Sequence, residues 1–316
     1  MRAETVKELA LSCGFDLAGI AAAEPADEFA AYRRWVEAGF AGEMTYLTDH
    51  RAAARADPRH LLPSARSIIC VGKLYNGPEP YSTRFSDPER AWISRYAWGD
   101  DYHRVLRRGL RQLAARLMQH FPQGFDWRIA VDTAPLLERE YARRAGLGWT
   151  GRNSCLINQR LGSWFFLGEL LTSLSLEPDA PPPDRCGSCT RCVDACPTGA
   201  ILPDARTIDA RACISYLTIE LRGPVPDLYH ARMGNHVFGC DICQDVCPWN
   251  RRAPRQRDPA FGPRLFAPRL EKLASISEQE FAAMFRGSPV MRARYAGFMR
   301  NVSIAMSNRT ARVAAP

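Results

Sequence analysis

The chain has 316 residues, enough for about two domains of common size, and 46% hydrophobic with 24% charged residues is typical of a globular protein. This composition is too apolar for a disordered chain, and no apolar run approaches the roughly 20 residues that a membrane helix needs. The first residues do not resemble a secretory signal, and Arg33-Arg34 lies in a polar, periodic stretch unlike a twin-arginine signal. We therefore expect a soluble, cytoplasmic protein.

The net charge of +8 is concentrated near the end of the chain. Residues 251–316 contain 13 basic and 4 acidic side chains, and the remainder is almost neutral. A basic surface attracts polyanions such as nucleic acid. A coding bias toward arginine would give the same excess without a partner, since lysine occurs only at positions 7, 73 and 272.

The first 178 residues alternate between apolar runs and amphipathic segments. The leucines of residues 101–120 follow one helical stripe, with arginines on the other face, which predicts a helix. Short apolar runs predict strands at 15–20, 66–75 and 127–131, and residues 163–176 form a further strongly apolar segment. This alternation favours a layered α/β domain, with parallel and mixed strand orders both left open.

Asp132 follows the predicted strand 127–131 directly, and a helix is expected to begin at Thr133. Chemistry often collects where strands of an α/β sheet end, which favours a catalytic residue. An aspartate before a first turn that contains proline is also a common helix cap. Both interpretations are open at this point.

Other candidates carry weaker signals. Residues 146–151 match the G-x-G-x-x-G pattern, but the residues before them are predicted helical rather than strand, so we do not expect nicotinamide binding. The six histidines show no zinc-binding spacing and are expected to be surface or core residues. Cys13, Cys70 and Cys155 lie in apolar contexts and are expected to be buried thiols.

Eight of the eleven cysteines fall between positions 186 and 247. Residues 186–197 have the C-x₂-C-x₂-C-x₃-C-P spacing of bacterial ferredoxins, in which the fourth cysteine binds the other cluster. Residues 240–248 repeat part of this run, and Cys213 supplies the missing ligand. Crossing the ligands predicts one 4Fe–4S cluster on Cys186, Cys189, Cys192 and Cys247 and a second on Cys196, Cys213, Cys240 and Cys243.

Zinc is the alternative metal, because C-x₂-C pairs also build tetrahedral sites. The third cysteine at the next x₂ interval and the two C-x₃-C-P endings favour iron–sulfur clusters. A ferredoxin module joined to an α/β domain predicts delivery of single electrons to a redox centre or an electrophilic substrate in the first domain.

Several longer motifs resemble the epoxyqueuosine reductase family. They are Val-Asp-Thr-Ala-Pro-Leu-Leu-Glu-Arg at 131–139, Gly-Trp-Thr-Gly-Arg-Asn at 148–153, Gly-Ser-Trp-Phe-Phe-Leu-Gly-Glu at 162–169, Cys-Ile-Ser-Tyr-Leu-Thr-Ile-Glu at 213–220 and Phe-Gly-Cys-Asp-Ile-Cys-Gln at 238–244. With the cysteine run, the matches extend from about residue 44 to 305.

The resemblance implies a cobalamin-dependent oxidoreductase of queuosine biosynthesis that is related to reductive dehalogenases. Such an enzyme reduces the epoxide of epoxyqueuosine at the wobble position of tRNA, using cob(I)alamin and electrons from two 4Fe–4S clusters. It implies that Asp132 is the proton donor, and we expect burial to raise its pKa. Residues at positions that the family uses near cobalamin are Arg55, Asp132, Leu156, Leu167 and Ser215.

We therefore expect an α+β fold. A layered α/β cobalamin domain at 1–178 precedes a ferredoxin-like domain at 179–255 and a basic helical segment at 256–316. The expected partners are tRNA and an external low-potential donor of the ferredoxin or flavodoxin type, with the chain as a monomer. The predicted tRNA contacts are Arg251, Arg252, Arg255 and Arg257, with Arg292, Arg294 and Arg300 alongside.

Two other functions compete with this one. A cobalamin-containing, reductive-dehalogenase-like oxidoreductase would act on a small molecule and would usually carry an export signal. A plain iron–sulfur electron-transfer protein would bind no cobalamin and turn over no substrate.

Overall fold

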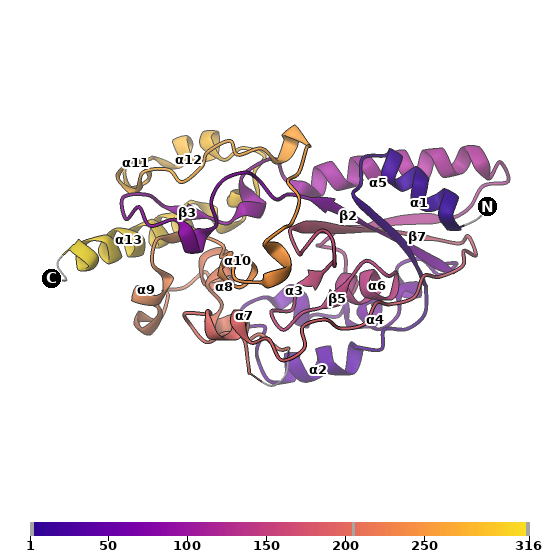
Figure 1. Ribbon diagram of the computed structural model, residues 1–316, viewed down its shortest axis with the longest axis horizontal. Coiled ribbons are helices and arrows are strands. Elements are labelled where there is room, and N and C mark those ends of the chain that lie inside the picture. The colour runs from indigo at the N-terminus through magenta and orange to yellow at the C-terminus, as the bar shows by residue number, and fades with distance from the viewer. Residues whose placement is uncertain (1–2, 204–205, 314–316) are drawn as a thin grey trace.

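A four-stranded sheet forms the centre of the N-terminal half in the computed structural model, which describes residues 3–203 and 206–313 (Figure 1). Its strand order is β1-β2-β7-β4, and every neighbouring pair is antiparallel. The strands are β1 (Leu17–Ala22), β2 (Ser67–Leu74), β7 (Phe165–Thr172) and β4 (Trp127–Ala130). The three predicted strands are present, and the apolar segment at 163–176 contains β7. Neighbouring strands all run in opposite directions, so both the parallel and the mixed order that the sequence left open are wrong.

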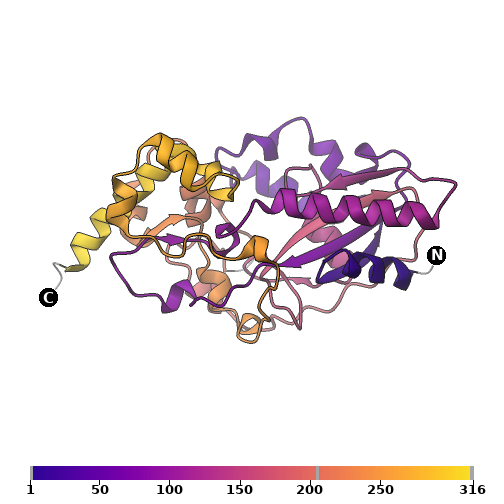
Figure 2. The same cartoon turned by 90° about the horizontal axis from the view of Figure 1, so that it is seen from above.

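Helices cover both faces of this sheet, which explains why its strands are apolar on both sides. On one face, α1 (Ala3–Ser12) and the predicted helix, α5 (Tyr102–His120), pack on Ile69 and Val71. On the other, α6 (Glu138–Arg144) packs on Ile68 and Cys70. Successive β2 side chains therefore alternate between two cores. Figures 1 and 2 show α5 running along the sheet.

Most of the other elements are short, and they are distributed along the whole chain. The remaining helices are α2 (Phe29–Glu37), α3 (Thr45–Thr48), α4 (Ala52–Ala56), α7 (Arg191–Asp194), α8 (Ile214–Ile219), α9 (Asp227–Met233), α10 (Ile242–Asp245), α11 (Leu270–Ala274), α12 (Glu278–Met284) and α13 (Arg294–Val313). The remaining strands are β3 (Trp92–Ile93), β5 (Trp149–Thr150), β6 (Leu156–Ile157) and β8 (His236–Phe238). Seven 3₁₀ turns connect these elements within the described residues.

One hydrophobic core contains residues from both halves of the chain. β3, from the N-terminal half, pairs in parallel with β8, which lies between Cys213 and Cys240 in the sequence. Trp92 and Phe238 then pack with Phe298 and Val302 of α13. The boundaries expected at 178/179 and 255/256 stay a prediction, and residues 91–98 lie with the C-terminal helices.

None of the helices in the described ranges, 3–203 and 206–313, combines the length and apolar character needed to cross a membrane.

Candidate active site

Asp132 lies on a loop that leaves the end of β4. The helix expected from Thr133 is absent, because α6 begins only at Glu138 and its capping residue is Leu137. Asp132 has φ of 48°, in the left-handed region that few residues other than glycine, asparagine and aspartate adopt. The helix-cap interpretation is therefore wrong. Backbone strain of this kind collects at functional sites.

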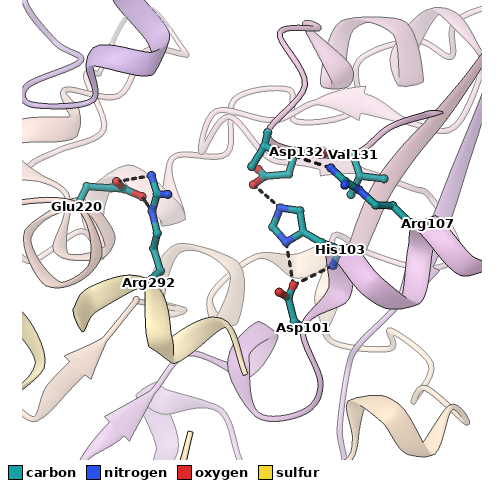
Figure 3. Close-up of polar contacts among 8 residues, drawn as sticks. Asp101, His103, Arg107, Val131, Asp132, Glu220 and Arg292 are labelled. Carbon is teal, nitrogen blue, oxygen red and sulfur yellow. Dashed lines mark hydrogen bonds and ion pairs between the residues drawn. The ribbon is translucent and has the colours of Figure 1, made fainter. Parts of the chain in front are cut away.

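The Asp132 carboxylate is one end of a three-residue chain of hydrogen bonds. His103 Nε2 lies 3.0 Å from Asp132 Oδ2, and His103 Nδ1 lies 2.8 Å from Asp101 Oδ1. Asp101 also accepts the backbone N–H of His103 and so caps α5. Figure 3 shows the imidazole held between the two carboxylates. The start of α5 thus positions a histidine against the loop that carries Asp132.

This arrangement sets the protonation of all three groups. Burial disfavours a charged imidazole, but the bonds to Asp101 and Asp132 outweigh it and raise the pKa of His103 to about 9. Burial opposes ionisation of Asp132 as well, yet His103 and the Tyr102 hydroxyl lower its pKa below the ordinary value. The expected rise in the pKa of Asp132 is therefore wrong for this structure. The proton is held by His103, which the sequence interpretation had left without a function.

Two further carboxyl groups lie below the Asp132 loop. The Asp132 backbone N–H donates to Glu138, whose pKa burial raises to about 7 with help from the Asp132 charge. Glu169 on β7 is fully buried, and burial together with Glu138 and Asp132 raises its pKa well above the ordinary value. Both residues belong to motifs that the sequence analysis quoted without assigning a function to them.

The C-terminal half supplies the opposite side of the site. Arg292, just before α13, forms a 3.0 Å ion pair with Glu220, and its charge lowers the pKa of Asp132. The Arg292 guanidinium also lies 5.3 Å from the ring centre of Tyr46. Figure 3 shows the Glu220–Arg292 pair on the other side of Asp132 from α5.

The residues expected to contact cobalamin divide into an apolar wall and polar groups. Leu156 and Leu167 are buried in one hydrophobic cluster beside the Asp132 loop. Arg55 is buried, donates to the Tyr46 carbonyl at 2.6 Å and lies 3.8 Å from Asp49. Ser215 forms a side-chain hydrogen bond with Cys213, whose thiol pKa is raised by burial.

Buried polar atoms test whether this region fits such a cofactor. Within the described residues, Arg55 Nη1 and both carboxyl oxygens of Glu169 are buried without a hydrogen-bond partner. Natural proteins rarely leave such atoms unpaired, so a ligand that carries amide groups would satisfy them. The apolar wall and these donors and acceptors fit a large amphipathic cofactor such as cobalamin.

The eight cysteines gather in two groups. The pKa of the Cys247 thiol is raised by burial and by the nearby Cys186 and Cys192. Burial, Cys186 and Cys189 likewise raise the pKa of Cys192. In the same way, Cys213 and Cys196 contribute to the raised pKa of Cys240, and Cys240 and Cys213 contribute to that of Cys243. The sets are those expected from crossed ligation, whose assignment to clusters stays a prediction.

The cysteines outside the run differ from one another. Cys70 is buried as expected, whereas Cys13 and Cys155 are only half-buried. Cys155 lies against Cys243 and interacts with that thiol directly. The loop between Cys240 and Cys243 is held by Asp241, a buried carboxylate that accepts from Ser94 and from the backbone N–H of Arg95.

The arginines expected at tRNA have different environments. Those predicted after the cysteine run are all exposed, namely Arg251, Arg252, Arg255 and Arg257. Arg294 is exposed too, and Arg292 is paired with Glu220. Arg300 is half-buried and donates to the carbonyls of Leu217, Leu221 and Gly223, so it holds α8 to α13 rather than facing a phosphate.

Two family models match this chain, one over the cysteine-rich region and one over part of the N-terminal half. Residues 185–250 match the family model described as "4Fe-4S double cluster binding domain", and residues 55–133 match "Epoxyqueuosine reductase QueG, DUF1730". Together with the site, these matches define an iron–sulfur oxidoreductase. The Escherichia coli (strain K12) epoxyqueuosine reductase is 40% identical over 97% of this chain and 81% of its own length. The Aliivibrio fischeri enzyme is 42% identical over 97% and 82%. The chain belongs to the epoxyqueuosine reductase family.

Solved structures agree with this assignment. A crystal structure of selenomethionine-labelled epoxyqueuosine reductase has a TM-score of 0.88 at 32% identity and covers 98% of this chain and 82% of its own. A crystal structure of epoxyqueuosine reductase with an epoxyqueuosine-modified tRNA-Tyr stem loop has a TM-score of 0.86 at 32% identity, covering 97% and 81%.

Proposed function

We propose that this chain reduces the epoxide of epoxyqueuosine in tRNA, in the cytoplasm, with cobalamin and two 4Fe–4S clusters as cofactors. The observation that carries the proposal is the hydrogen-bonded pair of Asp132 and His103, which can hold and transfer a proton. Asp132 of this pair lies on a strained loop beside the apolar side chains of Leu156 and Leu167. Membership of the epoxyqueuosine reductase family supports the same reaction. Domain boundaries at 178/179 and 255/256 and a monomeric chain are part of the proposal.

Removal of the epoxide oxygen as water consumes two electrons and two protons. Cobalamin held by Arg55, Asp132, Leu156, Leu167 and Ser215 would supply the reducing centre, and clusters on the eight cysteines would relay electrons to it from an external ferredoxin-type donor.

The protein's own residues provide the protons. At neutral pH the pKa of His103, about 9, keeps one proton on the imidazole, 3.0 Å from Asp132. This proton moves from His103 to Asp132, and Asp132 passes it to the opening epoxide oxygen. Glu138, with a pKa of about 7, bonds to the Asp132 backbone and holds a second proton nearby.

The test uses purified protein reconstituted with iron, sulfide and cobalamin. It is incubated with an epoxyqueuosine-containing tRNA stem loop and a low-potential reductant, and nucleosides are identified by mass spectrometry. Queuosine should form with the natural protein and should not form with Asp132→Asn, whose iron content should be unchanged. Asparagine tolerates the left-handed backbone at this position, so the variant isolates proton donation. Failure of the fully loaded natural protein to convert the stem loop would refute the proposal.

A further inference from the structure

The exposed face of α5 carries four arginines in one row. Arg104, Arg107, Arg108 and Arg111 are spaced by three, four and seven residues, which places them on one side of the helix. All four are exposed and line an open hollow of about 390 Å³ together with Asp100 and Val105. We call these four residues the α5 arginine row. They span about 10 Å along the helix axis.

The positive charge of this row is not compensated by the protein. Among the residues that the structure describes, none of the four forms an ion pair with a carboxylate. The two acidic residues at this end of α5 are already used, since Asp100 pairs with Arg264 and Asp101 pairs with His103. A hollow lined by four guanidinium groups that form no ion pair within the described residues, against one carboxylate already paired elsewhere, favours a polyanion.

The row begins at the reaction site. Arg107 Nη2 lies 3.5 Å from Thr133 Oγ1, on the residue next to Asp132 (Figure 3). His103, which precedes Arg104 on the same helix, binds Asp132 itself. A nucleotide with its base at Asp132 would carry its flanking backbone close to this end of α5.

We propose that the α5 arginine row binds backbone phosphates that flank the target nucleotide of the RNA. This inference rests on the proposed function and adds a surface that the sequence analysis did not predict. Arginine guanidinium groups suit phosphate geometry, and such contacts position RNA without reading its sequence. An acidic electron-donor protein is the rival occupant. It is disfavoured because α5 covers the sheet, whereas Cys186 and Cys247 pack against the β5–β6 pair.

The test compares two double variants that lose the same charge. Arg108→Gln/Arg111→Gln removes half of the row, away from Asp132, and the matched control is Arg116→Gln/Arg232→Gln. Arg116 lies further along α5, where it bonds to Ser12, and Arg232 is exposed on α9. Binding of an unmodified anticodon stem-loop RNA is measured at several salt concentrations with the cofactor-loaded proteins.

The row variant should bind the RNA roughly tenfold or more weakly, with a slope of log affinity against log salt shallower by about 1–2. The control variant should stay within about twofold of the natural protein. An unchanged affinity and slope in the row variant would overturn the inference. So would intact RNA binding combined with slower reduction by a flavodoxin-type donor, which would assign the row to a protein partner. Because binding is measured on unmodified RNA, failure of the proposed function shows separately, as absent turnover in the natural protein.

Discussion

His103 donates through both ring nitrogens, 3.0 Å to Asp132 Oδ2 and 2.8 Å to Asp101 Oδ1. An ionised carboxylate can only accept hydrogen bonds, so a ring between two of them is doubly protonated. The positive imidazole in turn keeps Asp132 ionised. Before the reaction the transferable proton is therefore on His103. Asp132 receives it from His103 and passes it to the substrate.

Replacement of His103 by glutamine tests this storage. The glutamine amide preserves a donor toward Asp132 but carries no transferable proton. We expect the rate of epoxide reduction to fall roughly 100-fold, the lower range for loss of acid–base assistance. Single-turnover rates against pH give the decisive readout. The natural enzyme should lose activity as pH rises through about 9, the pKa of His103, and the variant should lack that limb. A variant that keeps the limb near pH 9 would assign it to another group.

The same pair makes stability depend on pH. The pKa of His103 rises from an ordinary 6.5 to about 9 on folding, so its stabilising contribution is complete below pH 6.5 and is lost as pH rises through about 9. Asp101 and Asp132 have lowered pKa values, so their contribution is present above pH 3.8 and is lost as pH falls below that value. The pH-dependent part should be about 1–2 kcal/mol, because Asp132 is half exposed and solvent screens the pair.

This linkage is measured by urea unfolding of the natural protein and His103→Gln between pH 5 and pH 10. The difference in unfolding free energy should be constant below about pH 6.5 and shrink between about pH 6.5 and pH 9. Glu8→Gln, at an exposed side chain on α1 that forms no ion pair among the described residues, is the control and should show no such trend. A difference that stays constant up to pH 10 would contradict a doubly protonated His103.

The sheet strands could be recognised in the sequence because β1, β2 and β7 are mostly apolar, whereas β4 begins with the exposed Trp127 and Arg128. β2 and β7 are buried on both faces, so their sequences are apolar whichever strand lies beside them. Strand order was not predictable, since antiparallel pairing follows from contacts between residues about 100 positions apart, such as Ile69 with Leu170. Local patterns carry no information on such pairing.

The site was predicted only in part, for a similar reason. Asp132 was found because it ends a strand, but the helix expected after it does not form, and the loop takes a left-handed turn instead. His103 was missed because its partner lies 29 residues away and no metal-binding spacing marks it. One available signal was Asp101 at the start of a strong helix, since a capping aspartate fixes the residue two positions later.

Asp241 links the cysteine-bearing loop to the shared core, and its loss should loosen the second cluster. This carboxylate is buried and accepts from Trp92 Nε1 at 3.1 Å, Ser94 Oγ at 2.5 Å and Arg95 N at 2.8 Å. Asp241→Ala leaves these buried donors unpaired, so we expect a loss of roughly 3 kcal/mol in unfolding free energy. The iron chromophore should bleach at lower urea than in the natural protein. Asp227→Ala, at an exposed residue, should change stability by no more than about 0.5 kcal/mol.

The crossed ligation of the two clusters can be tested by pairs of serine substitutions. If Cys186 and Cys247 hold the same cluster, Cys186→Ser/Cys247→Ser removes one cluster and leaves about four irons in each reconstituted chain. Cys196→Ser/Cys247→Ser then damages both clusters and leaves almost no iron. Uncrossed ligation, with Cys196 beside Cys186 and Cys247 beside Cys240, predicts the loss of both clusters in the first variant. Cys13→Ser is the matched control, because Cys13 lies on the far face of the sheet by α5 and should leave the iron content unchanged. Iron and acid-labile sulfide per chain, together with the spectrum of the remaining reduced cluster, distinguish the two arrangements.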